Sequence, residues 1–318
     1  MSTPELTGYP GGDAGDWKKR YRAFVDERRG EPVAEATVTA VVVTWAGSQG
    51  VEDCLRSLRR AQNALDQQAE IIVVDNGAGP QLAEATKHNW DRWIRFRSNL
   101  GPGPARNLGA AEAAGEFVAF VDDDGLVEPD YFVSALSYFN DPNLVALRGR
   151  VVAQDHPWFT LLATHYDRGP EPVEDALVTE GASVIRRRAL IDAGGFPDAV
   201  IGHEGIELTY RLTRDVDRAK TLYVPDVVLR HDFLQSWNGF VAKCLSYAEN
   251  EAAVQTRSPD IAQYMSDYFS RSYPSRPLGP GSGLIRIALQ AMRSLLQTGG
   301  HLYYRIQHRS AKPPTSEP

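Results

Sequence analysis

The chain has 318 residues, 42% hydrophobic and 24% charged, which is typical of a folded globular protein and not of a disordered or fibrous one. Its net charge of −7 argues against nucleic acid as a partner, and its two cysteines exclude a disulfide framework and a cysteine-rich zinc site. With no apolar run long enough for a membrane span and no secretory signal, we expect a cytoplasmic protein in a reducing compartment.

The first residues are rich in glycine, proline and charge, and we expect an N-terminal extension over 1–35 with a short helix at Trp17–Arg29. The main domain is expected over 36–232, because this segment alternates between strand-like and helix-like patterns. Residues 233–318 are expected to form a helical C-terminal region.

The first half of the main domain alternates regularly between apolar strands and helices. Strands are expected at Val38–Trp45, Glu70–Val74, Ile94–Arg97 and Phe117–Val121, and helices over 51–65 and at Asn107–Ala114. This order predicts an α/β fold with a mostly parallel central sheet and helices on both faces.

The second half is less regular. Strands are expected at Leu144–Val152, at Ala176–Ile185 and at Thr221–Leu229 with an interruption at Pro225, and helices at Arg187–Ala193 and Ile206–Thr213. Prolines and glycines over 274–283 predict a linker, and Leu284–Gln297 reads as an amphipathic helix that either packs on the body or lies on a membrane surface.

Polar residues follow three of the expected strands: Thr44 and Trp45, then Asp75, then Asp122, Asp123 and Asp124. Ligands of parallel α/β sheets bind at these carboxyl ends. Asp75 alone could equally be a helix cap. Three adjacent aspartates repel one another, and a bound Mg²⁺ or Mn²⁺ would relieve that repulsion, although a solvated acidic turn is the alternative.

A loop with two glycines, residues 99–107, precedes the Ala-rich helix. Pro102 and Pro104 remove two backbone donors, so the loop is not a standard phosphate cradle, and it lacks both the dinucleotide fingerprint and the P-loop pattern. The guanidinium of Arg106 could pair with a phosphate instead, or form a surface salt bridge.

Several segments, taken in order, resemble the family 2 glycosyltransferases. They are Val-Val-Val-Thr-Trp at 41–45, Ile-Val-Val-Asp-Asn-Gly at 72–77, Asn-Leu-Gly-Pro-Gly-Pro-Ala-Arg-Asn-Leu-Gly at 99–109, Phe-Val-Ala-Phe-Val-Asp-Asp-Asp at 117–124, Gly-Ala-Ser-Val-Ile-Arg-Arg at 181–187, Gly-Gly-Phe at 194–196 and His-Glu-Gly-Ile-Glu-Leu-Thr-Tyr-Arg-Leu at 203–212. The resemblance spans roughly residues 37–232. It implies the GT-A fold, which is Rossmann-like, and inversion at the anomeric carbon.

The resemblance also implies a role for each matching residue. Asp75 would accept hydrogen bonds from the donor's base, expected to be uracil, in a pocket lined by Thr44 and Trp45. Arg106 would lie near the base and diphosphate. In the Asp-x-Asp motif, Asp122 would contact the ribose, Asp123 would border the nucleotide-sugar, and Asp124 would hold a divalent cation together with His231.

The expected catalytic base is where the sequence departs from the family pattern. The family usually carries Glu-Asp at the start of this helix, with the aspartate as base, but here the pair is Glu204-Gly205. We expect Glu204 to be the base and Glu207, one turn further on, to be the second candidate. The alternative is that Glu204 only caps the helix. The segment 181–183 resembles the acceptor side of the family.

The C-terminal tail is basic while the body is acidic. From Arg271 onward the charge is +6, which leaves −13 for the rest of the chain. This asymmetry, with the amphipathic run, predicts that residues 284–312 touch an anionic membrane at its inner face. A helix packed on the body and a solvated tail are the alternatives.

The predicted function is therefore metal-assisted transfer of a sugar from a nucleotide-sugar, most simply a UDP-sugar, to a hydroxyl acceptor by single displacement. The acceptor would be a glycan, a lipid-linked molecule or a small molecule. A non-catalytic nucleotide-sugar-binding protein and a metal-dependent phosphohydrolase are the rival hypotheses. An oxidoreductase is disfavoured by the missing glycine fingerprint.

Overall fold

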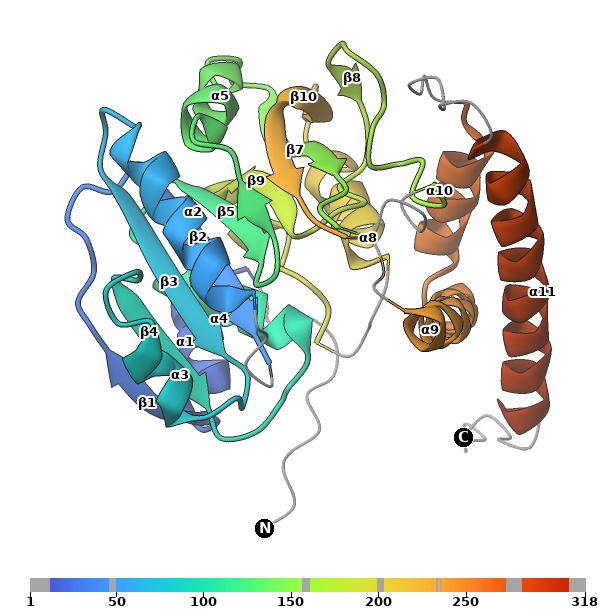
Figure 1. The fold of residues 1–318 in the computed structure, drawn as a ribbon, viewed down its shortest axis with the longest axis horizontal. Helices are drawn as coiled ribbons and strands as arrows, with labels where there is room; N and C mark the ends of the chain where they lie inside the picture. Colours follow the sequence, from blue (N-terminus) through green and yellow to red (C-terminus); the bar gives the residue numbers. More distant parts are fainter. Residues whose placement is uncertain are drawn as a thin grey trace, which may run out of the picture.

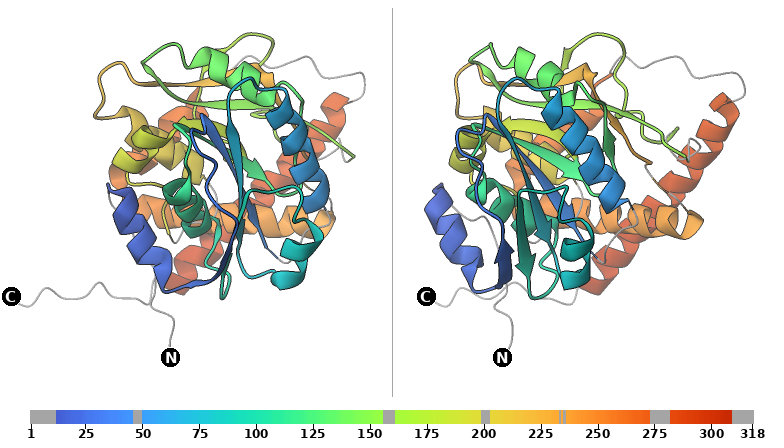
Figure 2. Two further views of the ribbon diagram at one scale, coloured as in Figure 1. Left: turned by 90° about the vertical axis from the view of Figure 1, so that its left-hand side faces the viewer. Right: turned by 60° about the vertical axis from the view of Figure 1, so that its left-hand side comes forward.

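The structure is a computed structural model that describes residues 12–45, 50–155, 161–198, 203–232, 234, 236–272 and 282–308, without the side chains of 249–257, 301 and 303–308. A ten-stranded sheet runs through the molecule with helices on both of its faces (Figures 1 and 2). The α/β class predicted from the sequence is confirmed.

The sheet has the strand order β1-β4-β3-β2-β5-β9-β7-β10-β6, with β8 paired to β10. Its strands are β1 (Val25–Arg29), β2 (Val38–Thr44), β3 (Ala69–Asp75), β4 (Arg92–Phe96), β5 (Phe117–Asp122), β6 (Leu126–Val127), β7 (Leu144–Val152), β8 (Val173–Glu174), β9 (Ala182–Arg186) and β10 (Lys220–Arg230). Strands β4, β3, β2 and β5 are mutually parallel, whereas β9 runs antiparallel to both β5 and β7.

Helices cover the sheet in the order of the chain. They are α1 (Ala14–Arg22), α2 (Val51–Asn63), α3 (Pro80–Ala85), α4 (Pro102–Glu112), α5 (Tyr131–Tyr138), α7 (Arg187–Asp192), α8 (Glu204–Thr213), α9 (Trp237–Arg257), α10 (Pro259–Ser270) and α11 (Ser282–His308). The left view of Figure 2 shows α1 and α4 on one face of the sheet and α2 and α3 on the other.

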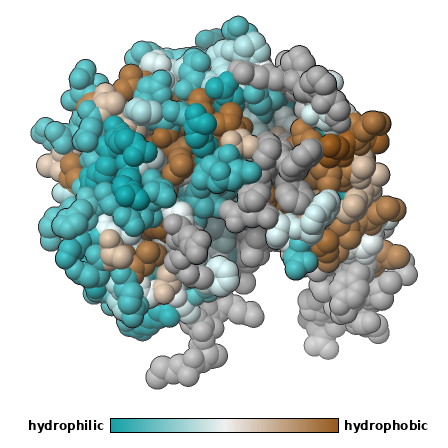
Figure 3. Space-filling model, viewed as in Figure 1, coloured by the Kyte–Doolittle hydropathy of each residue, from teal (hydrophilic) through white to brown (hydrophobic). Residues whose placement is uncertain are grey.

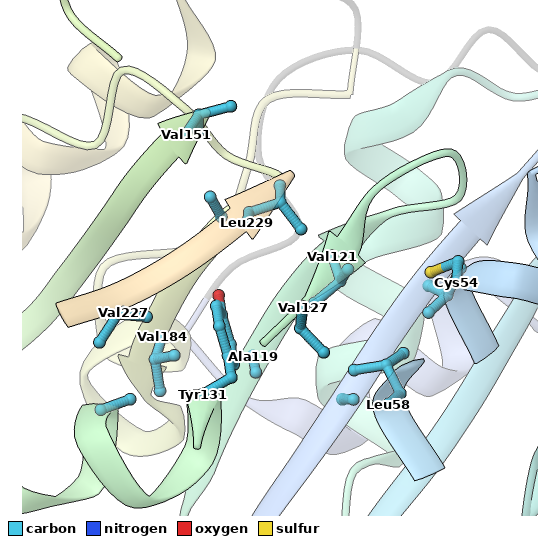
Figure 4. Packing of buried hydrophobic residues seen from close by; sticks show 14 of the residues in the cluster. Cys54, Leu58, Ala119, Val121, Val127, Tyr131, Val151, Val184, Val227 and Leu229 are labelled. Atoms are coloured by element: carbon cyan, nitrogen blue, oxygen red, sulfur yellow. The ribbon is translucent and has the colours of Figure 1, made fainter. Parts of the chain in front are cut away.

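Alternate residues of the central strands feed two separate cores. Val38, Ala40 and Val42 of β2 pack toward α2 and α5, while Val41 packs toward α1 and α4. Figure 4 shows the first core, where Cys54 of α2 lies with side chains from β5, β6 and β10. Because strand side chains alternate between faces, a strand buried on both sides reads as a continuous apolar run.

The N-terminal segment adds a strand to the sheet. Helix α1 is capped by Asp13 and buries Trp17 completely, and β1 pairs antiparallel with β4. The helix expected over Trp17–Arg29 is therefore wrong in its second half, where strand pairing overrides the helical propensity of Asp-Glu-Arg-Arg. The described part of the expected extension packs onto the sheet.

Two other elements differ from the expected ones. Helix α4 begins at Pro102, five residues before the predicted start, because prolines in a first helical turn remove only N–H groups that have no intrahelical partner. The strand expected at Ala176–Ile185 is present only from Ala182. In β10, the register shifts between Val224 and Val228, as the interruption at Pro225 predicted.

The C-terminal helices are tied to the sheet by a buried polar network. The hydroxyl of Tyr268 in α10 donates to Asp175 Oδ1 at 2.9 Å and accepts from Arg168 Nη2 at 2.8 Å. Arg148 of β7 binds the same Asp175 carboxylate through Nε and Nη2. Helix α11 packs along α9, and the expected linker at 274–283 lies almost wholly outside the described residues.

Candidate functional site

The carboxyl ends of β2, β3 and β5 meet at one edge of the sheet. In the parallel register Thr44 lies opposite Asp75, and Val43 lies opposite Asp122. The polar residues predicted to bind a nucleotide therefore emerge from three neighbouring strands at the same edge.

Asp75 holds the turn that follows β3. Its Oδ1 accepts hydrogen bonds from the backbone of Gly77 at 3.0 Å and Ala78 at 2.6 Å, and its Oδ2 accepts from Gly79 at 3.3 Å. Burial raises the pKa of Asp75, and these three donors oppose the rise. The carboxylate thus fixes a turn at the rim of the candidate nucleotide pocket.

Thr44 and Trp45 flank this turn in opposite ways. Thr44 is fully buried, and its Oγ1 has no hydrogen-bond partner within the described part of the chain. Trp45 is 61% exposed, with its indole open to solvent. An open aromatic ring beside a polar turn can stack on a planar base.

Arg106 and Asp122 face each other between α4 and β5. Arg106 Nη2 lies 3.6 Å from Asp122 Oδ1, and its guanidinium carbon lies 5.4 Å from the ring centroid of Phe196. Gly181, at the start of β9, allows Asp122 this position, because a Cβ there would lie only 1.9 Å from Asp122 Cγ. A guanidinium held this way can receive a phosphate.

Asp124 and His231 form a second pair beside Asp122. Asp124 Oδ1 lies 3.1 Å from His231 Nε2, and Tyr166 Oη lies 3.4 Å from His231 Nδ1. Burial opposes both charges, yet the mutual contact keeps the pKa of Asp124 below and that of His231 above its ordinary value.

This pair fits a divalent cation as a partial ligand set. A carboxylate oxygen and an imidazole nitrogen that face each other suit Mg²⁺ or Mn²⁺, and such cations commonly complete their shell with substrate phosphates. Within the described ranges, no group of three or more His, Cys, Asp or Glu side chains is arranged as a metal site by itself. The two ligands predicted from the sequence are brought together.

Asp123, the middle aspartate, relates to α2 rather than to this pair. Burial first, and then the charge of Asp123, raises the pKa of Cys54 in α2. The two cavities described below are not lined by Asp123. Its predicted contact with the nucleotide-sugar therefore stays a prediction.

A cavity of about 630 Å³ opens next to the strand ends. Its walls come from α4, the segment before β9, α8, and the C-terminal helices α9, α10 and α11 (Figure 1). Charged side chains from all of these elements reach it, namely Arg106, Arg168, Glu180, Glu204, Lys243, Arg271 and Arg293. A concave site with a few converging polar groups is where a substrate binds.

The two glutamates of α8 are placed differently. Glu204, the first residue of the helix, lines the cavity, whereas Glu207 does not. The charge of Glu207 instead raises the pKa of Arg211, although burial brings that pKa down to about 10. Of the two bases predicted from the sequence, only Glu204 faces this cavity.

Glu180 and Lys243 were not predicted from the sequence. Both line the large cavity and also a second cavity of about 80 Å³ that Asp122 and His231 share. Burial lowers the pKa of Lys243, against the charges of Asp122, Glu180 and Asp124. Glu180 directly precedes the segment 181–183 assigned to the acceptor side, so its position carried a signal. Lys243, on a C-terminal helix, carried none.

Comparisons with known proteins agree with this geometry. A sequence model of glycosyl transferase family 2 matches residues 39–193. A pre-mycofactocin glycosyltransferase of Mycobacterium tuberculosis (strain CDC 1551 / Oshkosh) is 27% identical over 237 residues, which cover 70% of this chain and 48% of that protein. The succinoglycan biosynthesis protein ExoO of Rhizobium meliloti (strain 1021) is 38% identical over 99 residues, 29% of this chain and 27% of that protein. This chain thus spans about half the length of the mycobacterial relative.

Solved structures show the same fold. The mannosyltransferase PcManGT of Pyrobaculum calidifontis, solved with GDP-Man and Mn²⁺, has a TM-score of 0.52 at 18% identity, over 95% of this chain and 82% of that one. TarS of S. aureus has a TM-score of 0.51 at 17% identity, over 86% of this chain and 55% of that one. These likenesses establish the GT-A fold for this chain.

Proposed function

Because residues 39–193 belong to glycosyl transferase family 2, we propose that this chain is an inverting glycosyltransferase that moves a sugar from a nucleotide diphosphate sugar to a hydroxyl group. The observation that supports the proposal most is the meeting of Asp75, Arg106 and Asp122 at one sheet edge beside a large cavity. The edge would hold the donor and the cavity the acceptor.

The donor would be held by residues from three strand ends and one helix. Asp75 and the Thr44–Trp45 segment would receive the base, expected to be uracil, and Asp122 the ribose. Arg106, already within 3.6 Å of Asp122, would lie against the diphosphate. A guanidinium there stabilises the negative charge that grows on the leaving diphosphate as the sugar departs.

Asp124 and His231 would hold a divalent cation, Mn²⁺ or Mg²⁺, together with the donor's phosphates. When bound, such a cation neutralises part of the charge on the diphosphate. PcManGT, which shares the fold, was solved with Mn²⁺ and GDP-Man. This supports the same chemistry here.

A carboxylate on the acceptor side would remove the proton of the attacking hydroxyl. The acceptor oxygen then bonds to the anomeric carbon while the bond to the diphosphate oxygen breaks, which inverts the configuration. Glu204, the residue predicted from the sequence, is one carboxylate in the cavity, and Glu180 is the other.

The C-terminal helix would bring the enzyme to its acceptor at a membrane surface. One face of α11 packs on α9, where Gly300 meets Ala248 and Leu245. The other face leaves Leu284, Ile287, Leu295 and Leu302 exposed, and Figure 3 shows hydrophobic residues along this side of the molecule. Both expectations for this helix thus have support. Among the described residues, no helix has the length and hydrophobicity that a membrane span requires.

Donor binding tests the proposal. A panel of UDP-sugars and GDP-mannose is titrated by calorimetry, with and without Mn²⁺, into the wild type, Asp124→Ala and the control Asp192→Ala, an exposed aspartate of α7. We expect one donor to bind with Mn²⁺, with affinity reduced at least about tenfold in Asp124→Ala alone. Binding without any hydrolysis would favour the non-catalytic alternative, and no binding at all would exclude the transferase.

A further inference from the structure

The backbone at position 205 has no room for a side chain. Gly205 is the second residue of α8, and a Cβ there would lie 1.6 Å from the carbonyl oxygen of Leu177 and 2.8 Å from Glu180 Oε1. The aspartate that the family pattern places at this position is therefore excluded on this backbone, and the base must come from another residue.

The Glu180 carboxylate occupies the place beside Gly205. The backbone N–H of Gly205 donates to Glu180 Oε1 at 2.6 Å. A carboxylate at the first turn of a helix is stabilised by the N–H groups that point out of it. The bond fixes Oε1 on the helix, and the other oxygen of the same carboxylate, Oε2, remains to contact a substrate.

Glu180 also lies between the donor side and the acceptor side. It lines both the 630 Å³ cavity and the 80 Å³ cavity that contains Asp122 and His231, whereas Glu204 lines only the first. Its neighbour Gly181 is in contact distance of the Asp122 carboxylate, and Asp122 N donates to Gly181 O at 3.2 Å. The sugar must be transferred at this junction.

We propose that Glu180 is the catalytic base, a role that rests on the transferase function proposed above. Oε2 of Glu180 takes the proton of the acceptor hydroxyl while that oxygen bonds to the anomeric carbon. The bond between the anomeric carbon and the diphosphate oxygen breaks, and its electron pair leaves with the nucleoside diphosphate. Glu204 then orients the acceptor from the first turn of α8.

Hydrolysis of the bound donor, with water as acceptor, tests the assignment without a known acceptor. The probe is whichever of UDP-glucose, UDP-N-acetylglucosamine and GDP-mannose binds the wild type. Glu180→Gln keeps an oxygen for the Gly205 N–H, so the fold is preserved, and Glu204→Gln is the matched control from the same cavity. Donor affinity is measured in parallel by calorimetry.

We expect Glu180→Gln to keep its donor affinity and to lose about 100-fold or more in hydrolysis rate, the usual contribution of a general base. Glu204→Gln should lose far less, and added formate should restore part of the rate of Glu180→Ala. Loss of hydrolysis in Glu204→Gln with little change in Glu180→Gln overturns the assignment, as does a Glu180→Ala variant that formate does not rescue. Absence of donor binding to the wild type would instead refute the transferase function itself.

Discussion

At the scale of single residues, the close approach of α8 to Leu177 makes position 205 sensitive to one added carbon. In Gly205→Ala the methyl group would overlap the Leu177 carbonyl and crowd the Glu180 carboxylate. We expect a loss of about 1–3 kcal/mol in the free energy of unfolding, the usual effect of overpacking, measured by urea denaturation.

Gly299→Ala is the matched control for this prediction. Gly299 is also helical, in α11, and a Cβ there would meet nothing within 4 Å. Alanine favours a helix interior over glycine by about 0.5–1 kcal/mol, so this variant should be unchanged or more stable. Equal stability of the two variants would show that the space at position 205 is not restricted.

The residues at the strand ends could be predicted because parallel strands end at a common edge. Asp75, Asp122 and Asp124 follow apolar runs, and that pattern alone brings them together. The sequence could not tell which helix face would turn to the cavity, so Glu204 and Glu207 looked equivalent. Glu180 lies in a loop with no periodicity, and only the tertiary contact with Gly205 marks it.

At the scale of secondary-structure elements, α1 holds the N-terminal edge of the sheet. Trp17 of α1 is completely buried against α4 and the Gly195 turn. Trp17→Ala should lower the free energy of unfolding by about 3–5 kcal/mol, because a large cavity is left in the core. Urea denaturation followed by circular dichroism measures it.

Trp45→Ala provides the comparison, since it removes the same side chain from an exposed position. We expect its stability to stay within about 0.5 kcal/mol of the wild type. Similar losses in both variants would contradict the burial of α1 on the sheet.

The start of α8 is held by His203, which joins three helices and responds to pH. Its φ of 65° is in the left-handed region, and its ring lies 4.9 Å from Tyr247 of α9 and 5.3 Å from Phe269 of α10, centroid to centroid. Burial, together with the charge of Arg293, lowers its pKa from 6.5 to about 4. The imidazole is therefore neutral in the folded protein near neutral pH.

Its stabilising contribution is complete above pH 6.5 and decreases as the pH falls toward 4, because the unfolded chain binds the proton first. Between pH 7 and pH 5 the wild type should lose on the order of 1–2 kcal/mol more stability than His203→Asn. Asparagine tolerates the same backbone conformation. Unfolding curves at both pH values give the comparison, and parallel losses would refute it.

The elements were predicted best where tertiary context adds least. The strand expected at Leu144–Val152 has the same bounds in the structure. Strand β1 was missed because Asp-Glu-Arg-Arg disfavours strands, and only pairing with β4 stabilises it there. Residues 176–181 have strand-like composition but leave the sheet to border the cavity, which no local pattern reveals.

At the scale of the whole molecule, the exposed stripe of α11 predicts binding to lipid. Leu284 and Leu295 are 78% and 76% exposed on one face of this helix. The double variant Leu284→Ser/Leu295→Ser should bind vesicles of phosphatidylcholine with 30 mol% phosphatidylglycerol roughly tenfold less tightly, since two leucines would no longer enter the interface. Vesicle co-sedimentation measures the affinity.

Val133→Ser/Val216→Ser removes exposed apolar side chains from elsewhere on the surface and serves as the control. Its vesicle affinity should match that of the wild type. A wild type that binds anionic vesicles no better than neutral ones, or an equal loss in both double variants, would rule out α11 as the contact.

The two-sided character of α11 also fixes a height. Arg293 lies in the cavity wall while Leu284 and Leu295 point outward from the same helix. A helix with its side chains is about 10 Å across, so with the leucines resting on lipid the cavity stands roughly 10 Å above the bilayer. A hydroxyl at the lipid surface would be out of reach. An acceptor raised on a phosphate or on a first sugar would span that gap, so the width of one helix would select which lipid-linked molecules are glycosylated.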